Sequence, residues 1–402
     1  MKTLQGTPDH IRGQRIGILT RTPKTWPARR HYILLATSRT APGYAGAILA
    51  HAVRRAPFAP AAVSGLPPAA LADLHDGDIL ALTPDGTVAV LWDGAQQSNG
   101  ILMTERCNCR CLMCPQPPKE DAPGLDETND RLLQLLPEIR PDTICITGGE
   151  PTLKRTRFLK TLDAITRELP QAAVDILTNG QTFADFEFAR AAAECAPART
   201  TFCISLHADT AALHNRITGS TDGFARTLRG IRNLGKLGIP VEIRFVLMRL
   251  NHDRVAEFAR FVGQNFPFVV HVALMGLEMT GKALENEAQV WVEPAEYAGS
   301  LRIAIQELRR RNVPASIYNV PLCLLDRRVW PAARQSISAW KNGYLPACES
   351  CQGKTFCCGV FTTSERFSQR IRPVDPADIQ PLQDYRNKYI NDKIKLCGGP
   401  SE

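Results

Sequence analysis

Four cysteines lie close together in the stretch Cys107-Asn-Cys-Arg-Cys111-Leu-Met-Cys114. Cys107, Cys111 and Cys114 follow one another at intervals of four and three residues, so their thiolates can converge on one soft metal centre. A four-iron cluster needs a ligand on every iron, and three protein ligands would leave one iron open for a small molecule. The fourth thiol, Cys109, falls inside the first interval. The spacing therefore predicts a metal centre with one open position.

A second stretch with the right residue types is Gly148-Gly149-Glu150-Pro151-Thr152, which directly follows the apolar run 143–147. Gly148 and Gly149 have no side chains, so their backbone can approach a ligand closely. The carboxylate of Glu150 can accept hydrogen bonds from an ammonium group. On its own the stretch is a good turn for any protein. Its place after a buried strand favours a ligand-binding role.

The two stretches together, in this order and at this distance, resemble the radical S-adenosylmethionine (SAM) superfamily over roughly residues 100–315. A zinc ribbon would need a second cysteine pair within about 15 to 20 residues, and none follows Cys114. The resemblance implies a [4Fe-4S] cluster on Cys107, Cys111 and Cys114, SAM as cofactor and a reducing electron donor. It also implies a 5'-deoxyadenosyl radical that abstracts hydrogen from a substrate. No catalytic protein side chain can be assigned from the sequence.

Further contacts with SAM or substrate are implied where later strands end. Thr178 and Asn179 follow the third predicted strand, and Ser205 and His207 close the fourth. Arg244, in the fifth strand, has the chemistry to pair with the methionine carboxylate, although an arginine satisfied in the core or at the rim is nearly as good an interpretation. The expected cofactor-binding set is Gly148, Gly149, Glu150, Thr178, Asn179, Ser205, His207 and Arg244.

Strands that alternate with helices must position these residues. Six β-prone runs begin near residue 100, and helical periodicity separates them, which indicates βα units around a parallel sheet. The cysteines follow the first strand directly. Six units suggest an open partial (β/α)6 barrel, in which ligands gather at the carboxyl ends of the strands. The expected strands are Ile101–Thr104, Thr143–Thr147, Val174–Leu177, Thr201–Leu206, Val241–Met248 and Val269–Leu274.

Residues 1–99 are expected to form a separate, small β-rich domain ahead of the core at 100–315. Short β-prone runs lie at Ile16–Leu19, Tyr32–Ala36, Ile79–Leu82 and Val88–Leu91. Asp85-Gly86 separates the last two runs, which predicts a β-hairpin. The whole chain is therefore expected to be an α/β protein with an N-terminal β-rich addition.

A C-terminal cysteine-rich extension is expected over residues 316–402. Its thiols Cys323, Cys348, Cys351 and Cys357 suffice for a closed metal site, for which zinc, an auxiliary iron-sulfur cluster and unliganded cysteines compete. The pattern Cys-x-Gly-x-Phe favours Cys357 over Cys358 as the ligand. Auxiliary clusters are common in radical SAM enzymes that modify peptides, so the resemblance favours iron-sulfur.

Composition limits the class of protein. The chain has 402 residues, of which 44% are apolar, so we expect more than one domain. Despite thirteen cysteines, neither a signal-peptide run at the start nor an 18-residue apolar stretch occurs, which predicts a cytoplasmic protein without a membrane span. The net charge of +8 is spread along helical faces such as Arg302–Arg311 and argues against a nucleic-acid partner.

Short segments narrow the resemblance further. Thr104-Glu-Arg-Cys107, Leu112-Met-Cys-Pro-Gln-Pro-Pro-Lys119, Tyr318-Asn-Val-Pro-Leu-Cys323 and the cysteine pattern that ends at Phe361 resemble the C-type radical SAM maturase of the His-Xaa-Ser repeat system. This implies a peptide or protein substrate with His-Xaa-Ser repeats. One alternative is a radical SAM enzyme for a small molecule or RNA. An alternative of another class is a non-catalytic iron-sulfur or zinc module, which would bind no SAM.

Overall fold

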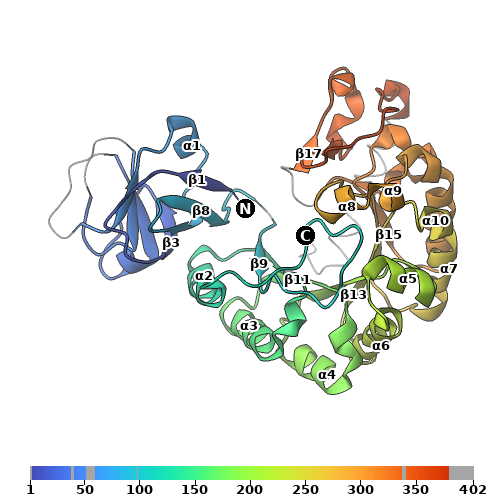
Figure 1. Ribbon diagram of the computed structural model, residues 1–402, viewed down its shortest axis with the longest axis horizontal. Coiled ribbons are helices and arrows are strands. Elements are labelled where there is room, and N and C mark those ends of the chain that lie inside the picture. The colour runs from blue at the N-terminus through green and yellow to red at the C-terminus, as the bar shows by residue number, and fades with distance from the viewer. Residues whose placement is uncertain (1, 38–39, 51–58, 97, 337–340, 380–402) are drawn as a thin grey trace, which may run out of the picture.

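The computed structural model describes residues 2–37, 40–50, 59–96, 98–336 and 341–379 (Figure 1). The first eight-stranded sheet occupies the N-terminal part in the order β1-β8-β7-β3-β4-β5-β6-β2. The predicted hairpin is confirmed, because β7 and β8 pair antiparallel. The strands are β1 (Thr3–Gln5), β2 (Thr7–Asp9), β3 (Arg15–Thr20), β4 (Tyr32–Ala36), β5 (Gly46–Leu49), β6 (Ala62–Ser64), β7 (Ile79–Leu82) and β8 (Thr87–Trp92), with the short helix α1 (Pro68–Ala72).

The N-terminal sheet curls until its two edges meet. The edge strands β1 and β2 are consecutive in the chain and are separated only by Gly6. A Cβ atom at Gly6 would lie 2.5 Å from Val63 Cγ1 and 2.6 Å from the Ser64 carbonyl oxygen, so only glycine fits this corner. The predicted β-rich domain is therefore a curled sheet whose edges are joined by the chain itself.

The second sheet forms the core and is parallel throughout, in the order β16-β15-β14-β13-β12-β11-β10-β9. Helices lie along its outer side (Figure 1). The strands are β9 (Gly100–Leu102), β10 (Thr143–Thr147), β11 (Ala173–Thr178), β12 (Thr200–Ser205), β13 (Val241–Val246), β14 (His271–Met275), β15 (Ala315–Tyr318) and β16 (Ala333–Arg334). The helices are α2 (Leu125–Ile139), α3 (Arg155–Glu168), α4 (Phe186–Cys195), α5 (Ala211–Thr218), α6 (Gly223–Lys236), α7 (Val255–Asn265), α8 (Lys282–Glu285), α9 (Glu287–Val290) and α10 (Ala298–Arg310).

The two faces of this sheet differ in burial. Side chains on one face, such as Ile146, Ile176 and Phe245, are fully buried against the helices in the main hydrophobic core. The alternate residues face the barrel interior, because successive side chains of a strand point to opposite faces. Many of these interior residues keep partial exposure, Asp175 and Arg244 among them. This face of the sheet is therefore partly accessible to solvent.

All six predicted strands are present, but the sheet has two more. β15 and β16 extend it, and the predicted boundary at residues 315 and 316 falls inside β15. Both strands are short, with four and two residues, so they leave little periodicity in the sequence. The expected count of six strands was wrong for this reason.

Beyond the sheet, the C-terminal region is built mainly from turns. Its two-stranded antiparallel pair joins β17 (Asn342–Gly343) to β18 (Val360–Phe361). Residues 380–402 of the predicted extension lie outside the described residues. Among the described residues, no helix combines the length and apolar character required to cross a membrane.

Candidate metal and SAM site

The cysteine loop leaves the carboxyl end of β9 and packs against the glycine turn that follows β10. Gly149 N donates to the Thr104 carbonyl oxygen at 2.7 Å, and Glu150 N donates to the Arg106 carbonyl oxygen at 2.8 Å. A Cβ atom at Gly149 would lie 2.3 Å from the Arg106 carbonyl oxygen. The glycines thus allow the cysteine loop to approach closely, a role that the sequence did not indicate.

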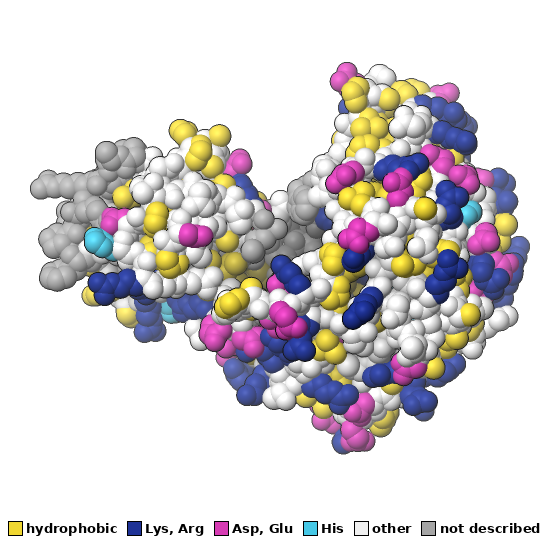
Figure 2. All heavy atoms as spheres, in the orientation of Figure 1, with side chains coloured by type: hydrophobic (Ala, Val, Ile, Leu, Met, Phe, Trp, Pro, Cys, Tyr) yellow, Lys and Arg dark blue, Asp and Glu magenta, His cyan; other side chains and the backbone are white. Residues whose placement is uncertain are grey.

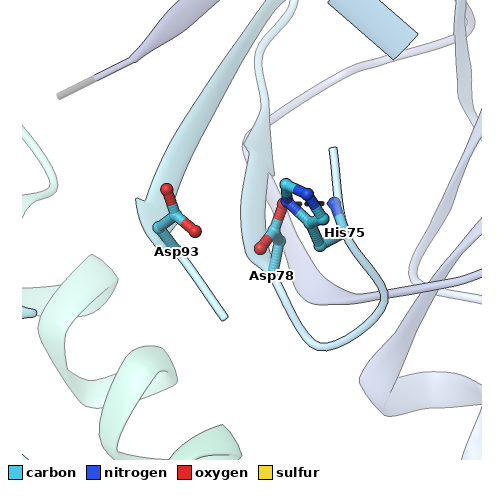
Figure 3. Close-up of side chains that lie close together, drawn as sticks. All are labelled: His75, Asp78 and Asp93. Carbon is cyan, nitrogen blue, oxygen red and sulfur yellow. Dashed lines mark hydrogen bonds between the residues drawn. The ribbon is translucent and has the colours of Figure 1, made fainter. Parts of the chain in front are cut away.

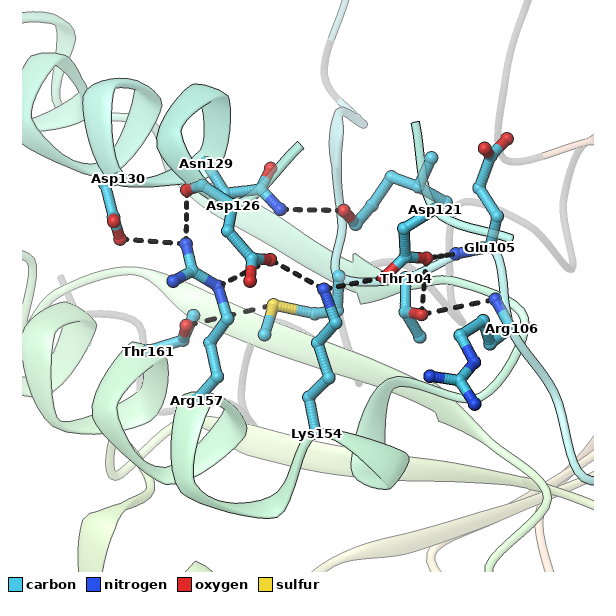
Figure 4. Close-up of polar contacts among 12 residues, drawn as sticks. Thr104, Glu105, Arg106, Asp121, Asp126, Asn129, Asp130, Lys154, Arg157 and Thr161 are labelled. Carbon is cyan, nitrogen blue, oxygen red and sulfur yellow. Dashed lines mark hydrogen bonds and ion pairs between the residues drawn. The ribbon is translucent and has the colours of Figure 1, made fainter. Parts of the chain in front are cut away.

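A carboxylate fixes the start of the same loop (Figure 4). Asp121 Oδ1 accepts hydrogen bonds from Thr104 Oγ1 at 2.7 Å and from Glu105 N at 2.6 Å. Its other oxygen pairs with Lys154 Nζ at 2.7 Å. Although desolvation raises the pKa of Asp121, the hydrogen bonds from Lys154, Thr104 and Glu105 lower it to about 2. No motif marks Asp121 in the sequence, because its partners come from a distant turn and helix.

The far side of the loop is anchored to α5 and α8. Leu112 N donates to the Ile217 carbonyl oxygen at 2.9 Å, and Lys282 N donates to the Cys114 carbonyl oxygen at 2.9 Å. Met113, just before the third cysteine, is buried in an apolar cluster that includes Met248. Backbone bonds and packing therefore hold the loop on both sides.

The four thiols of the loop fall into two classes. Cys107, Cys111 and Cys114 are half-buried, whereas Cys109 is buried and receives a hydrogen bond from Gln181 Nε2 at 3.1 Å. Three accessible thiols at one edge of a sheet fit a cluster with one open position. Among the described residues no three cysteine sulfurs lie within 4.8 Å of one another, whereas the sulfurs of a tetrahedral zinc site are about 3.8 Å apart. The donor set fits a cluster better than a single zinc ion.

Glu150 is buried and its carboxylate already has partners. Its Oε1 accepts from Thr178 Oγ1 at 2.8 Å and from Thr152 N at 3.1 Å, and its Oε2 accepts from Asn179 N at 2.7 Å. Burial raises the pKa of Glu150, and these hydrogen bonds oppose the shift. Glu150, Thr178 and Asn179 therefore lie together. Their hydrogen bonds join the turn after β10 to the end of β11. Of the two oxygens, Oε2 accepts one hydrogen bond among the described residues, so its second lone pair is the acceptor position left for a ligand ammonium group.

Ser205 and His207 end β12 in different environments. Ser205 is half-buried and faces the barrel interior beside Arg244 of β13. His207 is buried, and its Nδ1 accepts from Val246 N at 3.4 Å. Burial and the neighbouring His214 lower the pKa of His207 to about 3. His207 is therefore neutral and packed inside the protein in this structure.

Arg244 has a partner that the sequence did not predict. Its Nε donates to Glu242 Oε1 at 2.6 Å, two residues earlier on the same strand. Glu242 in turn contacts His271 Nδ1 at 2.8 Å. An ion pair between Arg244 and the methionine carboxylate would compete with Glu242.

The C-terminal cysteines line one cavity with apolar walls. Cys323, Cys348, Cys351 and Cys357 all reach it, and Cys358 does not. Cys357 Sγ accepts hydrogen bonds from Leu322 N at 3.4 Å and Gly359 N at 3.3 Å. The thiol of Cys358 and these backbone amides lower the pKa of Cys357 to about 6, despite burial. Cys357 is therefore the member of the pair that faces the cavity and forms a thiolate readily.

A further cluster lies in the N-terminal sheet, where the side chains of His75, Asp78 and Asp93 lie close together (Figure 3). The Asp78 carboxylate is buried and accepts hydrogen bonds from His75 N and Gly94 N, both at 2.8 Å. These bonds hold the turns around β7 and β8. The hydrogen bonds of Asp78 thus stabilise local turns, and the cluster does not by itself indicate a bound ligand.

Comparison with known proteins agrees with this geometry. The model of the radical SAM superfamily matches residues 101–262. A probable GTP 3',8-cyclase of Saccharolobus islandicus is 28% identical over 251 residues, which make up 60% of this chain and 77% of the relative. A probable GTP 3',8-cyclase of Metallosphaera sedula is 29% identical over 255 residues, with 60% of this chain and 75% of the relative covered.

The solved structures that match this chain have lower sequence identity. The SAM-bound structure of SuiB from Streptococcus suis has a TM-score of 0.46 and 18% identity, over 55% of this chain and 50% of SuiB. This chain therefore spans about half the length of SuiB. The structure of anSMEcpe with bound AdoMet and the Kp18Cys peptide has a TM-score of 0.49 and 13% identity, over 74% of this chain and 99% of anSMEcpe.

The residues matched by the superfamily model contain the cysteine loop, the glycine turn and five strands of the parallel sheet. Superfamily membership implies that the cofactors are a [4Fe-4S] cluster and SAM, for which the three half-buried thiols have the right character. The core of this chain, residues 101–262, thus matches the radical SAM superfamily, and the protein is a radical SAM enzyme.

Proposed function

We propose that this radical SAM enzyme modifies a peptide or protein substrate that carries His-Xaa-Ser repeats. The catalytic part rests on one observation, the three half-buried thiols in the loop at the carboxyl edge of the parallel sheet. The substrate class rests on the short segments that resemble the His-Xaa-Ser maturase. Cys107, Cys111 and Cys114 would hold the cluster. Bound there, such a cluster supplies the electron for reductive cleavage of SAM.

Other residues of the chain position the cysteine loop for this chemistry. Asp121, Gly149 and the end of α5 fix the cysteine loop, so the thiols need little rearrangement on binding. The expected SAM contacts from Gly148, Gly149, Glu150, Thr178, Asn179, Ser205, His207 and Arg244 remain part of the proposal. Of these, Ser205 is the best placed side chain, because His207 is buried and Glu150, Arg244 and Asn179 have internal partners.

A small molecule such as GTP is the second candidate, and the similarity to probable GTP 3',8-cyclases favours it. A triphosphate needs several Lys or Arg side chains around it. On the described strands of the core, the charged side chains on the interior face are Asp175, Glu242, Arg244 and Arg334. Two carboxylates and two guanidiniums give no net positive charge, which suits a peptide better than a triphosphate.

For an RNA substrate a basic surface would be expected. On the face shown in Figure 2, Lys and Arg side chains are mixed with Asp and Glu. Salt bridges also pair many Lys and Arg side chains of the described chain with carboxylates, for example Arg190 with Glu187 and Lys282 with Glu285. This face offers no separate basic patch for a nucleic-acid backbone.

We infer that Cys323, Cys348, Cys351 and Cys357 hold an auxiliary iron-sulfur cluster. They line one apolar cavity, which supports a shared centre. Their sulfurs are too far apart for three of them to meet one zinc ion in the described structure, whereas a cluster separates its thiolates by the irons between them. The described cysteines are all free thiols, which fits the proposed cytoplasmic location and a reducing donor.

Anaerobic turnover tests the catalytic part. The protein is reconstituted with iron and sulfide, SAM and a strong reductant are added, and 5'-deoxyadenosine is quantified. We expect product from wild type and none from Cys111→Ala, whereas the control Cys195→Ala, on helix α4, retains activity. If the fully loaded wild type made no 5'-deoxyadenosine, even with a candidate substrate present, the non-catalytic module would be the better interpretation.

Mass spectrometry tests the substrate class. The reconstituted enzyme is incubated separately with a His-Xaa-Ser repeat peptide and with GTP. We expect a mass change in the peptide only. Conversion of GTP without change of the peptide would contradict the peptide proposal and support the second candidate.

A further inference from the structure

Three side-chain amides surround the thiol of Cys109, the cysteine of the loop that the ligand spacing does not include. Gln181 Nε2 lies 3.1 Å from Cys109 Sγ, and Asn179 Nδ2 lies 3.6 Å from it. Asn108 joins the two amides, because its Oδ1 accepts from Asn179 Nδ2 at 2.8 Å and its Nδ2 donates to Gln181 Oε1 at 3.0 Å. Cys109 and Gln181 are both 2% exposed, so the network reaches into the protein.

One backbone amide fixes the direction of every bond in this network. Gln181 N can only donate, so the atom of Asn179 that it contacts at 3.0 Å is the carbonyl oxygen Oδ1. Asn179 Nδ2 must then face Asn108 Oδ1, which leaves Asn108 Nδ2 to donate to Gln181 Oε1. Gln181 consequently presents Nε2 to Cys109. The thiol therefore accepts hydrogen bonds from two amides, and its own proton must point away from them.

Two of the proposed cluster ligands are also neighbours of the Cys109 thiol. It is in hydrogen-bond contact with the thiols of Cys107 and Cys111. The backbone amide of Cys109 donates to Cys107 Sγ at 3.3 Å. Because burial disfavours a charged thiolate, Cys109 keeps its proton and can donate it to a neighbouring sulfur. When Cys107 and Cys111 bind iron as thiolates, they become good acceptors for this S–H group.

We propose that Cys109 binds no iron and instead donates an S–H hydrogen bond to a ligand thiolate of the [4Fe-4S] cluster, which raises the reduction potential of that cluster. Asn179 and Gln181 orient the thiol for this bond. The inference rests on the proposed function, because it requires the other three thiols of the loop to be the ligands. Reduction adds negative charge to a cluster, and a hydrogen bond to a ligand sulfur stabilises that charge. Since Cys109 is a donor and not a ligand, one iron stays open for SAM.

The reduction potential tests this role independently of turnover. Each protein is reconstituted anaerobically with iron and sulfide, and the EPR signal of the reduced cluster is followed against applied potential without SAM. Cys109→Ala keeps the backbone donor and lacks the thiol. We expect this variant to hold as much iron per chain as wild type and to have a more negative midpoint potential. Cys109→Ser retains a hydroxyl donor, so its midpoint should lie between the two.

A second buried thiol provides the matched control. Cys203, on β12, is also 2% exposed, and Cys203→Ala should keep the wild-type midpoint. If Cys109→Ala lost iron to the extent that Cys111→Ala does, Cys109 would be a ligand and the inference would be overturned. A wild-type midpoint in Cys109→Ala would also overturn it, as would equal shifts in Cys109→Ala and Cys109→Ser.

The outcomes separate this inference from the proposed function. If reconstituted wild type held no iron-sulfur cluster on the loop, both would fail. If it held a reducible cluster but formed no 5'-deoxyadenosine from SAM, the enzymatic proposal alone would fail. The midpoint potentials would then still decide the role of Cys109, and they do so whether the substrate is a peptide or a small molecule.

Discussion

At the scale of single residues, the cluster loop depends on two glycines that touch its backbone. The Cβ atom that Gly149→Ala adds would meet the Arg106 carbonyl oxygen at 2.3 Å, and backbone atoms cannot move aside cheaply. We expect this variant to displace the loop and to lose most of its reconstituted iron, measured as iron and sulfide per chain. Gly100→Ala is the matched control, because its nearest atom lies at 3.5 Å. Normal iron content in Gly149→Ala would contradict this account of the turn.

Asp121 is the second residue on which the loop depends. The Asp121→Asn variant loses the ion pair with Lys154. It also weakens the hydrogen bond that Glu105 N donates to the side chain at position 121. A pKa lowered from 3.8 to about 2 corresponds to about 2 kcal/mol, or roughly 30-fold in a local opening equilibrium. We therefore expect amide hydrogen exchange over residues 103–112 to be roughly 30-fold faster in Asp121→Asn than in wild type. Glu120→Gln, whose side chain is 88% exposed, should leave exchange unchanged.

The contribution of Asp121 has a definite pH dependence. Because its folded pKa lies below its unfolded value, the stabilisation is complete above about pH 4 and is lost as the pH falls toward about 2. Exchange in wild type should therefore approach that of Asp121→Asn only in this acid range. A difference between the two proteins that disappeared near neutral pH would count against the ion pair.

Residue types could be predicted from the sequence more easily than their partners. The three thiols and the glycine turn were recognisable because their spacing is local. The bonds from Glu150 to Thr178 and from Arg244 to Glu242 were not, because they depend on which strands are neighbours and which way each side chain turns. Gln181, which contacts the buried Cys109, has no motif at all.

At the scale of elements, strong periodicity made most of the core predictable. The strands at Tyr32–Ala36, Ile79–Leu82 and Thr143–Thr147 have the bounds expected from the sequence. The short strands β1, β2, β5, β6, β15 and β16 were missed, since two to four residues carry little periodic signal. The closure of the N-terminal sheet through Gly6 could not be predicted either, because it depends on β1 pairing with β8 and β2 pairing with β6.

The junction of β12 and α5 contains two buried histidines. His207 N donates to His214 Nδ1 at 3.2 Å, and burial lowers the pKa of His207 to about 3 and of His214 to about 4. Between these values and the unfolded pKa of about 6.5, the unfolded chain binds protons that the native protein does not. Stability should therefore fall as the pH drops from about 6.5 to about 4, by up to about 1.4 kcal/mol per pH unit for each histidine.

Comparison of variants isolates this effect. We expect His214→Gln to be less stable than wild type near neutral pH but to lose less stability on acidification, measured by urea unfolding at several pH values. His10→Gln, at an exposed position, should keep the wild-type slope. If His214→Gln showed the same pH slope as wild type, the buried pair would not be the source of the acid sensitivity.

At the scale of the whole molecule, the N-terminal sheet and the barrel share one hydrophobic core. Ile16, Ile18 and Trp92 of the first sheet belong to the same buried cluster as Leu132 of α2. Arg131 of α2 adds a polar link, because its Nη2 donates to the Arg30 carbonyl oxygen at 2.9 Å. The first hundred residues are therefore expected to support the side of the barrel from which the cysteine loop emerges, although their sequence offers no chemistry of its own.

This shared core predicts that the two parts unfold together. Trp92 is 3% exposed, so Trp92→Ala leaves a cavity between them and should cost about 3 to 5 kcal/mol. In calorimetry we expect one transition for wild type and, for this variant, a lower midpoint with separation into two transitions. Trp26→Ala, at a position that is 67% exposed, should leave the transition unchanged. Two transitions in wild type would show that the sheet and the barrel are stable independently, and the barrel would then have to hold its cluster without the N-terminal sheet.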